Sequence, residues 1–547
     1  MSGHKNSRGH LSFKRYYFGP QTVVGHGRTT MVSDLFLFLL VFAQAVSVAN
    51  CVTPDRREGQ STISNYEVDV RANAAPIHIT GERFLSVAVD TNSLNKHWMH
   101  FNFSSAKLQT MTRALSPAYL RLGGRAGDFL IFKNPCDGSE PSTGDTGVED
   151  PLTYLCPQDW DDINNFCSDT GLKLIFGLNL LLRTEAGGWD PDNAEHLLDY
   201  NTHDVAWELG NEPNSFKKKA NITLSGSQIG IDFNLLRTVL NNRVRYVGAS
   251  VYGPDIGSVG RKKTSTMLEG FLSKTNTTNA TTFHSYYLNG RIATVDDFLD
   301  PETLDGLLPG QIDLVESLVS KYREPGSRVW LGETGSAFGG GAPNISDRFV
   351  AGFLFLDKLG MSARMGLDTV IRQTYYGGHY TMLDLENLDP KPDYWIAYIY
   401  KRLVGRRVLR VKITPPTTGS TPCSVKGGDK QYVRVYAHCT STNQSGYDAG
   451  AVTLIVLNMH KNDTANITLA RKLGGRTIQQ YLLTPYGPEG MTSPEVNLND
   501  SPLHLKDDTS LPEIEPVVIK RGKPMLVPPL SYGFYVVAKA KAKACLS

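Results

Sequence analysis

Short apolar runs alternate with helix-like amphipathic segments between residues 84 and 401. The runs fall at residues 84–89, 119–122, 172–179, 205–210, 246–252, 282–286, 329–332 and 369–374. Their length and their content of branched and aromatic residues predict buried strands, and segments such as 108–115 and 312–322 predict the helices between them. Eight strands that alternate with helices are typical of a (β/α)8 TIM barrel. A doubly wound sheet is the alternative, but no glycine-rich phosphate loop follows the first run.

The pattern changes after residue 402, where long helical patterns stop. Strand-like runs separated by turn residues follow at 432–437, 451–458, 478–483, 525–527 and 533–538. This pattern predicts a C-terminal β-sandwich over residues 403–547, after a catalytic barrel over residues 81–402. Residues 66–80 are expected to add strands to the sandwich from the N-terminal side.

The apolar run LFLFLLVFA at residues 35–43 precedes both regions. It has the length of a signal-peptide core and is too short to span a bilayer, so we expect a signal peptide over residues 1–49. The basic stretch before the run is long for a signal peptide, which makes Met31 a candidate start and a signal anchor the alternative. No apolar run of about 18 residues occurs, so the mature protein should not be polytopic. The signal peptide predicts a protein secreted to the extracellular matrix, with the lysosome and the cell surface as further destinations.

Composition and charge narrow the classes of partner. Hydrophobic residues make up 40% of the 547 residues and charged residues 20%, which is a globular balance. The net charge is only +2, so we expect no nucleic-acid partner, and a polyanion would have to bind local basic patches. No two cysteines of the sequence have the CxxC spacing of a structural zinc site, and we expect neither a metal ion nor a cofactor.

Two further features agree with secretion. An oxidising compartment favours disulfides, and seven cysteines are available: Cys51, Cys136, Cys156, Cys167, Cys423, Cys439 and Cys545. Asn-X-Ser/Thr motifs predict a glycosylated surface, at Asn102, Asn221, Asn276, Asn279, Asn344, Asn443, Asn462, Asn466 and Asn499.

The sharpest local signal is the segment DVAWELGNEPNSF at residues 204–216. Its apolar first half predicts a buried strand, and Glu212 follows directly where that strand ends. Pro213 stops the strand and fixes the turn. Because the carboxyl ends of the strands form the active-site floor of a (β/α)8 barrel, Glu212 is a candidate catalytic residue.

A second carboxylate has the same context. In VWLGETGSAFGGGAP, at residues 329–343, an apolar strand delivers Glu333 into a glycine-rich loop. Two such carboxylates perform glycoside hydrolysis, one protonating the leaving oxygen and the other attacking the anomeric carbon. Either Glu alone could be a salt-bridged structural residue, but the repeated context on the expected fourth and seventh strands favours a catalytic pair.

The two segments resemble the catalytic strands of the heparanases, which belong to glycoside hydrolase family 79. Further segments fit in order: FLSVAVD (84–90), LSPAYLRLGG (115–124), LIFGLNLLLRT (174–184), HSYYLNGR (284–291), SDRFVAGFLFLDKLGMSARMG (346–366) and PDYW (392–395). The resemblance runs from about residue 66 to residue 547 and is to an invertebrate-type member. It implies a retaining endo-β-glucuronidase that hydrolyses glucuronyl-glucosamine linkages of heparan sulfate. Glu212 would be its acid/base and Glu333 its nucleophile.

The resemblance also implies residues that contact the sugar. Asn211, directly before the acid/base, would bind the 2-hydroxyl, a contact that can strengthen in the transition state. Asp90 and Asn92 end the first strand at positions that face the sugar in the family. An ordinary Asx-turn is the alternative interpretation of Asp90.

More site residues are implied near the second glutamate. Tyr286 resembles a tyrosine that contacts the nucleophile, whereas His284 could belong to the core or to the site. The backbone of Gly339 and Gly340 would bind the uronate carboxylate, because no side chain intervenes. Tyr380 would assist them, although the segment YYGGHYTM differs from the family in loop length.

Basic clusters offer contacts for sulfate groups. Arg261, Lys262 and Lys263 follow the expected fifth strand and resemble the heparin-binding loop of the family. The three lysines at 217–219 follow the acid/base strand on the same face. A solvated charge run is the alternative, but two clusters that flank one cleft favour contacts with a polyanion.

The cysteines and the segment at residues 132–176 indicate whether a linker has to be excised from the chain. The resemblance implies a Cys439–Cys545 bridge, and Cys167 is expected to pair with Cys136 or Cys156. Vertebrate heparanases carry a long insert that is excised, but here residues 132–176 are short and their helical potential is weak. A Cys136–Cys156 bridge would close the first half into a compact loop. We therefore expect activity as a single chain, although the polar loop at 137–153 could be nicked.

Two other functions remain open at this level. An exo-β-glucuronidase acting on small glucuronides would carry the same catalytic pair. A catalytically inactive relative could bind heparan sulfate, although binding alone does not require paired carboxylates.

Overall fold

The computed structural model describes residues 62–136, 152–416 and 431–546, apart from residues 97, 99 and 444. The expected signal peptide, Met31, Cys51, Cys423 and the centre of the polar loop lie outside these residues. Within the described residues, no helix is both long enough and apolar enough to cross a membrane.

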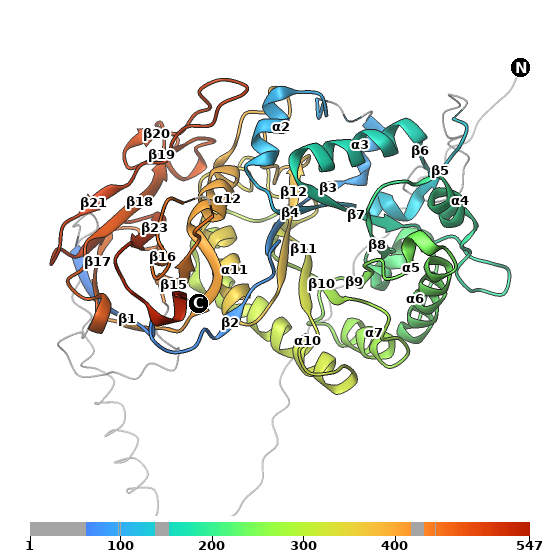
Figure 1. Cartoon of the computed structure of the whole chain (residues 1–547), viewed down its shortest axis with the longest axis horizontal. Helices are drawn as coiled ribbons and strands as arrows, with labels where there is room; N and C mark the ends of the chain where they lie inside the picture. The colour runs from blue at the N-terminus through green and yellow to red at the C-terminus, as the bar shows by residue number, and fades with distance from the viewer. Residues whose placement is uncertain are drawn as a thin grey trace, which may run out of the picture. The chain divides into compact units, whose positions relative to one another are not determined.

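Eight parallel strands form a barrel (Figure 1). In chain order they are β3 (Leu85–Asp90), β4 (Ala118–Gly123), β7 (Leu172–Leu178), β8 (Ala206–Leu209), β9 (Tyr252–Ile256), β10 (Ala280–Asn289), β11 (Val329–Phe338) and β12 (Thr369–Tyr376). Each strand lies beside its neighbours in this order, and β12 pairs with β3. A bridge between Trp207 and Val251 joins β8 to β9 and closes the ring. The prediction of a (β/α)8 barrel is confirmed.

Helices follow the strands and cover the barrel (Figure 1). They are α2 (Ala106–Arg113), α3 (Pro157–Thr170), α4 (Asp192–Tyr200), α5 (Phe216–Ala220), α6 (Gly226–Asn241), α7 (Lys262–Leu272), α8 (Val295–Leu299), α9 (Pro301–Gly306), α10 (Leu308–Tyr322), α11 (Ala351–Arg364) and α12 (Pro392–Leu403). Two short strands, β5 (Leu130–Phe132) and β6 (Thr153–Leu155), pair beside the barrel.

The alternation of side chains along the strands sorts the barrel interior into layers. An apolar layer fills one part of it: Ala88, Ile175, Ala206, Tyr252, Ala280, Trp330 and Ile371. Successive residues of a strand point to opposite faces, so residues two positions apart share a face. Glu208 lies two positions after Ala206 on β8 and is buried. Arg121 lies two positions after Tyr119, which packs against the apolar layer, and is also buried. The apolar layer therefore supports a charged layer nearer the carboxyl ends of the strands.

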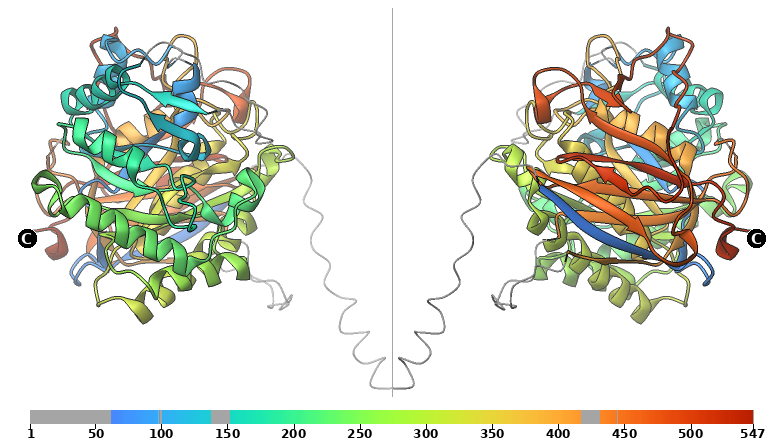
Figure 2. Two further views of the ribbon diagram at one scale, coloured as in Figure 1. Left: turned by 90° about the vertical axis from the view of Figure 1, so that its right-hand side faces the viewer. Right: turned by 90° about the vertical axis from the view of Figure 1, so that its left-hand side faces the viewer.

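Two further sheets pack as a β-sandwich, which is also confirmed. The larger contains β2 (His78–Ile79), β13 (Val404–Leu409), β15 (Val433–Thr440), β16 (Val452–Asn458), β23 (Ser531–Val537), β18 (Ile478–Pro485), β19 (Val496–Leu498), β20 (Ser501–Pro502) and β21 (Val517–Ile519). The smaller contains β14 (Val411–Thr414), β1 (Thr62–Val70), β17 (Asp463–Leu469) and β22 (Met525–Val527). The blue strand β1 from before the barrel lies among the orange and red strands in Figure 2.

The barrel and the sandwich share one apolar core, which reaches from the barrel helices to β15, β16, β18 and β23. Aromatic and polar contacts join them. The rings of Phe349 and Tyr532 stack at 4.6 Å, and the Tyr436 hydroxyl donates to Asp357 of α11 at 2.5 Å. The sandwich thus packs directly against the helices behind β11 and β12.

Two sequence predictions of local structure were wrong. The fifth strand is Tyr252–Ile256 rather than 246–252, because residues 244–246 form a 3-10 turn and the Gly-Pro pair inside the true strand imitates a turn. The stretch 132–176 contains the fourteen-residue helix α3 despite its weak propensity. Trp160, Ile163 and Phe166 are buried on one face of that helix, so tertiary packing outweighs local preference.

The cysteines correct one expectation and agree with another. Cys439 and Cys545 form a disulfide, as the family resemblance implied. Cys136 and Cys156 pair with each other, so the expected bridge to Cys167 is wrong. Cys167 is a free, buried thiol on α3. The Cys136–Cys156 bridge and the β5–β6 pair hold the two ends of the polar loop together.

Candidate active site

Arg121 is the centre of a buried charge network inside the barrel. Its side chain comes from β4 and is only 1% exposed. Nε donates to Glu208 at 2.7 Å, Nη1 to Glu333 at 2.9 Å and Nη2 to Asp255 at 2.9 Å. A buried guanidinium needs such partners, because an unpaired charge is costly away from water. Arg121 therefore fixes the ends of β8, β9 and β11 relative to one another.

The carboxyl groups around Arg121 differ in their protonation. Burial, with the charge of Asp255 added, raises the pKa of Glu208 well above its ordinary value, so Glu208 keeps its proton. Burial would also raise the pKa of Asp255, but Arg121 and His284 outweigh it and hold that pKa well below its usual range. Asp255 is therefore ionised beside the guanidinium.

Glu333 is held on both oxygens of its carboxylate. Oε2 accepts from Arg121, and Oε1 accepts from the Tyr286 hydroxyl at 2.8 Å. A bulge in β11 aims the side chain, because the register with β10 skips Gly332 and sets His284 opposite Glu333. A Cβ on Gly332 would lie 2.8 Å from Asp255 Oδ1, so glycine is needed at the bulge. The position of Glu333 thus depends on hydrogen bonds from the adjacent strand β10 and from β4 across the barrel.

Glu212 lies just beyond β8 in a strained backbone conformation. Its φ of 48° is rare for a residue other than glycine, and such strain is concentrated at functional sites. Its N–H donates to the Asp255 carbonyl at 2.8 Å, and its side chain is 31% exposed. A Cβ on Gly257 would lie 3.2 Å from Oε1, so that glycine leaves room for the carboxylate. Glu212 is therefore open to a ligand while its backbone is fixed.

His284 bridges the two glutamates, so it belongs to the site rather than only to the core. Nδ1 lies 3.2 Å from Glu212 Oε1 and 3.9 Å from Glu333 Oε1, and Nε2 lies 3.4 Å from Asp255 Oδ1. Burial would lower the pKa of His284, but the surrounding carboxylates raise it to about 10 and keep the ring protonated. Burial would raise the pKa of Glu212, but its hydrogen bond to charged His284 outweighs this and lowers that pKa.

The separation of the two glutamates indicates their chemistry. An oxygen of Glu212, an oxygen of Glu333 and a nitrogen of His284 all lie within 4.8 Å of one another. Retaining glycosidases hold their carboxyl groups about 5–5.5 Å apart, whereas inverting enzymes need about 6.5–9.5 Å to admit a water. The same three groups have the spacing of a metal-ligand set. The arrangement therefore suits double displacement at a sugar.

Asn211 is fixed on three sides directly before Glu212. Its Oδ1 accepts from Arg121 at 3.0 Å, its N–H donates to Asp128 at 3.0 Å, and its carbonyl accepts from Lys219 at 2.6 Å. Because Oδ1 is occupied, the Nδ2 group is left to donate to a ligand oxygen.

A cavity of about 380 Å³ adjoins this cluster. It is lined by residues that include Asp90, Asn92, Arg125, Gly340, Tyr376 and Tyr380. The Tyr380 ring stacks on Tyr286, whose hydroxyl binds Glu333, so the cavity lies next to the glutamates. Gly339 and Gly340 adopt φ values of 83° and 89°, which only glycine takes readily. The structure thus brings Asp90, Asn92, Gly340 and Tyr380 together, while Gly339 lies in the same turn.

Asp90 satisfies both interpretations of its role. The N–H of Asn92 donates to Oδ1 at 2.9 Å, which is an Asx-turn contact, and Gln373 donates to Oδ2 at 3.2 Å. Burial raises the pKa of Asp90 to about 6, although the Asn92 N–H lowers it. A Cβ on Gly124 would lie 2.6 Å from Oδ2, so the chain passes Asp90 closely. Asp90 is a turn residue that also faces the cavity.

The structure places the two basic clusters differently. Arg261, Lys262 and Lys263 are exposed at the start of α7, on the barrel face where β9 ends, but they do not line the cavity. Lys219 is buried and pairs with Asp128 at 3.2 Å, so its expected role as a sulfate contact is wrong. The other two lysines of that run are exposed.

Sequence reasoning missed the inner charged layer. Arg121, Glu208, Asp255 and Asp128 all escaped notice, although each was visible as a charged residue within or beside an apolar run. Such residues are almost never buried without a partner. Opposite charges in two separate predicted strands, Arg121 and Glu208, could therefore have indicated an internal network.

Comparisons with known proteins identify the family of the chain. Residues 93–360 match the model of the glycosyl hydrolase family 79 N-terminal domain. The chain is 40% identical to heparanase of Bos taurus over 518 residues, which cover 86% of this chain and 91% of that one. It is 34% identical to inactive heparanase-2 of Homo sapiens over 93% of this chain and 95% of that one. It is 32% identical to hyaluronoglucuronidase of Hirudo nipponia, over 85% and 96% of the two chains.

A solved structure shows the same fold at low identity. The 4-O-α-L-rhamnosyl-β-D-glucuronidase of Fusarium oxysporum superposes with a TM-score of 0.57 at 16% identity, covering 86% of this chain and all of that one. The extent of the sequence matches decides the family. This chain belongs to glycosyl hydrolase family 79 and is a glycoside hydrolase.

Proposed function

We propose that the protein is a retaining endo-β-glucuronidase that hydrolyses glucuronyl-glucosamine linkages of heparan sulfate. The observation that carries this proposal is the pair of carboxylates, Glu212 and Glu333, with oxygens within 4.8 Å of each other. Relatives named heparanase support the substrate class. Secretion fits the two disulfides of the described residues.

In the first step Glu333 attacks the anomeric carbon of the glucuronate. Arg121 and Tyr286 orient its two oxygens, so the lone pair that forms the new bond is presented in one direction. Glu212 gives its proton to the leaving glucosamine oxygen as the glycosidic bond breaks. A covalent glycosyl–enzyme ester results, linking Glu333 to the sugar.

In the second step Glu212, now ionised, takes a proton from an incoming water. The hydroxide attacks the anomeric carbon, the ester bond to Glu333 breaks, and the sugar leaves with its configuration retained. Asn211 donates from Nδ2 to the 2-hydroxyl, a contact that can strengthen as the ring flattens. The glucuronate carboxylate is received by the backbone of Gly340 and by Tyr380 in the adjoining cavity.

Trapping the intermediate tests the mechanism. A 2-fluoro-β-glucuronide with a good leaving group should label the protein stoichiometrically, and peptide mass spectrometry should place the label on Glu333. The Glu333→Gln variant should take up no label and should still bind heparan sulfate. A label on another carboxylate would overturn the assignment of the nucleophile.

A leaving-group comparison tests the acid/base. Glu212→Gln should be inactive on heparan sulfate but retain partial activity on an aryl glucuronide whose leaving group departs without protonation. Equal loss on both substrates would contradict the role of Glu212. If the unaltered protein hydrolyses neither substrate, the result would favour a binding protein without activity, such as the relative named inactive heparanase-2.

Product sizes decide between endo and exo action. Heparan sulfate digests should contain oligosaccharides rather than free uronate, and hyaluronan should be tested beside it because of the relative from Hirudo nipponia. Replacing Arg261, Lys262 and Lys263 by Ala should weaken long-chain binding and leave a minimal substrate unaffected. An equal effect on the minimal substrate would show that the cluster is structural.

We further propose that the protein is active without excision of a linker. The two ends of the loop at 137–151 are joined by Cys136–Cys156 and by the β5–β6 pair. A chain nicked in that loop would therefore stay covalently linked until reduced. The secreted protein, purified with protease inhibitors, should be active and migrate as one chain under reducing conditions. Activity that appears only after nicking would refute this proposal.

A further inference from the structure

A second cavity, of about 510 Å³, opens on the β-sandwich. Its lining includes Lys472, Arg476, Gln479, Arg521 and Lys539. The sheet topology brings them together, because the start of β18 pairs antiparallel with the ends of β21 and β23. A volume of this order is ample for a ligand the size of one or two sugar rings.

Among the described residues, the lining carries four cations and no carboxylate. Within the described ranges, none of these four side chains forms an ion pair with Asp or Glu, and Arg476 donates only to the carbonyl of Lys472. The neighbouring Arg471, outside the lining, does pair with Asp69 at 2.8 Å. Unneutralised cations in one concavity repel each other and attract an anion.

Gln479 supplies a neutral feature of the same cavity. Its Oε1 is buried and accepts no hydrogen bond from any described residue. A buried acceptor without a donor is costly, so the cavity suits a ligand that carries O–H or N–H groups as well as negative charge. Sulfated sugars carry both. No aromatic side chain of the described part of the chain lines the cavity, so nucleic-acid bases would find no ring there to stack on.

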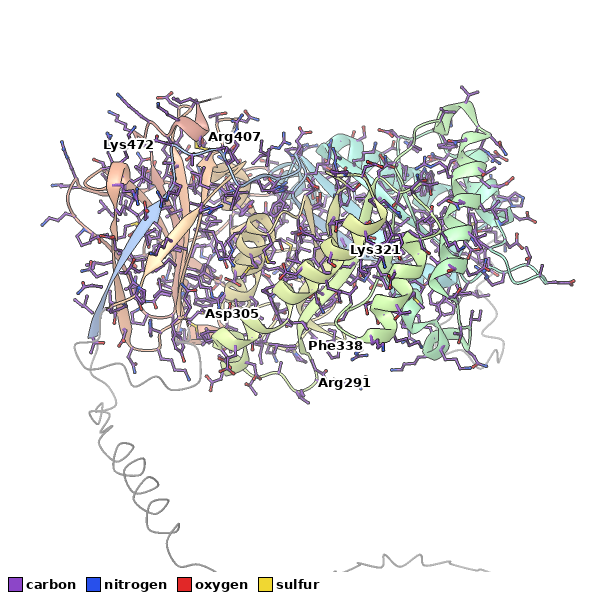
Figure 3. The ribbon with its side chains drawn as sticks, turned by 90° about the horizontal axis from the view of Figure 1, so that it is seen from below. Arg291, Asp305, Lys321, Phe338, Arg407 and Lys472 are labelled. Atoms are coloured by element: carbon purple, nitrogen blue, oxygen red, sulfur yellow. A yellow bond between two sulfur atoms is a disulfide. The ribbon has the colours of Figure 1, made fainter. Side chains whose placement is uncertain are left out.

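We propose that this cavity is a second binding site for a sulfated glycosaminoglycan, separate from the active site. The sulfate esters would bind the four cations, and a sugar hydroxyl or amide would donate to Gln479. The cavity shares no lining residue with the one beside Asp90. Figure 3 shows Lys472 on the sandwich, well apart from Arg291 and Phe338, which follow β10 and end β11 on the barrel.

A second site of this kind would strengthen the binding of long polysaccharide chains. This inference rests on the proposed function only in the choice of heparan sulfate as the polysaccharide. A chain long enough to occupy both sites is bound more tightly than either site alone would bind it, because the second contact becomes intramolecular. A short substrate that fills only the active site gains nothing. The cavity would thus favour long chains without taking part in the chemistry.

The test compares two variants that each remove four positive charges from the sandwich. The cavity variant replaces Lys472, Arg476, Arg521 and Lys539 by Ala. The matched control replaces the exposed lysines 520, 523, 541 and 543, which lie near the cavity in the sequence but outside its lining. Affinity for long heparan sulfate is measured as a function of salt in the Glu333→Gln background, and kcat/KM on a minimal fluorogenic glucuronide is measured in the active enzyme.

The cavity variant should bind long chains about tenfold more weakly and with a shallower salt dependence, whereas the control should lose less than about twofold. Both should hydrolyse the minimal substrate like the unaltered protein. Equal losses of heparan sulfate affinity in the two variants would overturn the proposal. It would also be overturned if the cavity variant lost affinity for anionic vesicles but not for heparan sulfate. If no variant or parent hydrolyses the minimal substrate, the proposed function fails while the binding result still stands.

A footprint on the unaltered protein covers the case of a variant that does not fold. Lysines are acetylated with and without a heparan sulfate oligosaccharide, and the modified positions are mapped by mass spectrometry. Lys472 and Lys539 should be protected while Lys541 remains reactive. Protection confined to Lys262 and Lys263 of the barrel would refute a site on the sandwich.

Discussion

Replacing His284 by Gln should move the basic limb of the pH–rate profile upward. The protonated ring lies 3.2 Å from Glu212 Oε1 and lowers the pKa of that carboxyl group. Glutamine keeps a neutral donor of similar size but removes the positive charge. The burial of Glu212, which raises its pKa, then acts without this opposition. The acid form of Glu212, which the first step needs, should persist to higher pH in the variant.

The size of the shift follows from the distance. Two unit charges 3.2 Å apart attract each other by about 5 kcal/mol at an effective dielectric of 20 and by about 1.3 kcal/mol in bulk water. The Glu212 side chain is 31% exposed, so the lower part of this range applies. Since about 1.36 kcal/mol corresponds to one pKa unit, the basic limb should rise by about one to two units.

The assay measures kcat/KM against pH on two substrates. A heparan sulfate oligosaccharide requires protonation of its leaving group and should report the shift. An aryl glucuronide with an activated leaving group should not. His379→Gln, an exposed histidine on the turn beside Gly340, is the control and should leave the profile unchanged. A basic limb that stays in place or moves down in His284→Gln would refute the reasoning, whatever the height of the profile.

Other predictions concern stability, metal independence and glycosylation. Arg121→Met should lower the free energy of unfolding by about 3–5 kcal/mol in a denaturant titration, because it leaves buried carboxylates unpaired. The variant should also lose turnover. A variant that is as stable and as active as the unaltered protein would contradict the network. Replacing Cys439 and Cys545 by Ser should lower the free energy of unfolding by up to about 5 kcal/mol, since their bridge closes a separation of 106 residues. An unchanged free energy of unfolding would refute this. Prolonged dialysis against a chelator should leave kcat/KM unchanged, and restoration of lost activity by a divalent cation would reveal a metal. Asn499 should be unglycosylated in a site-mapping experiment, because its Nδ2 donates to the Gln480 and Glu515 carbonyls, and an occupied site would show that this contact is dispensable.

The sequence by itself determined the architecture and the two glutamates. Short continuous apolar runs identified the strands of the barrel, apart from the fifth, because parallel strands are buried on both faces. Glu212 and Glu333 were visible because each follows an apolar run in the sequence, although β11 continues past Glu333 to Phe338. The fifth strand was misplaced where Gly253 and Pro254 interrupt the apolar pattern, and α3 was missed where propensity opposes burial.

Only the tertiary structure decided how the site is held together. Arg121, Glu208 and Asp255 are 47 to 134 residues apart in the sequence, and no local pattern relates them until the barrel closes. The role of His284 depended on three carboxylates from other strands, and the burial of Lys219 depended on Asp128. Protonation states and pairings of this kind arise from distances between strands, which hydrophobic periodicity does not encode. The pattern of the chain therefore sets which residues face inward, and the closed barrel sets what they meet there.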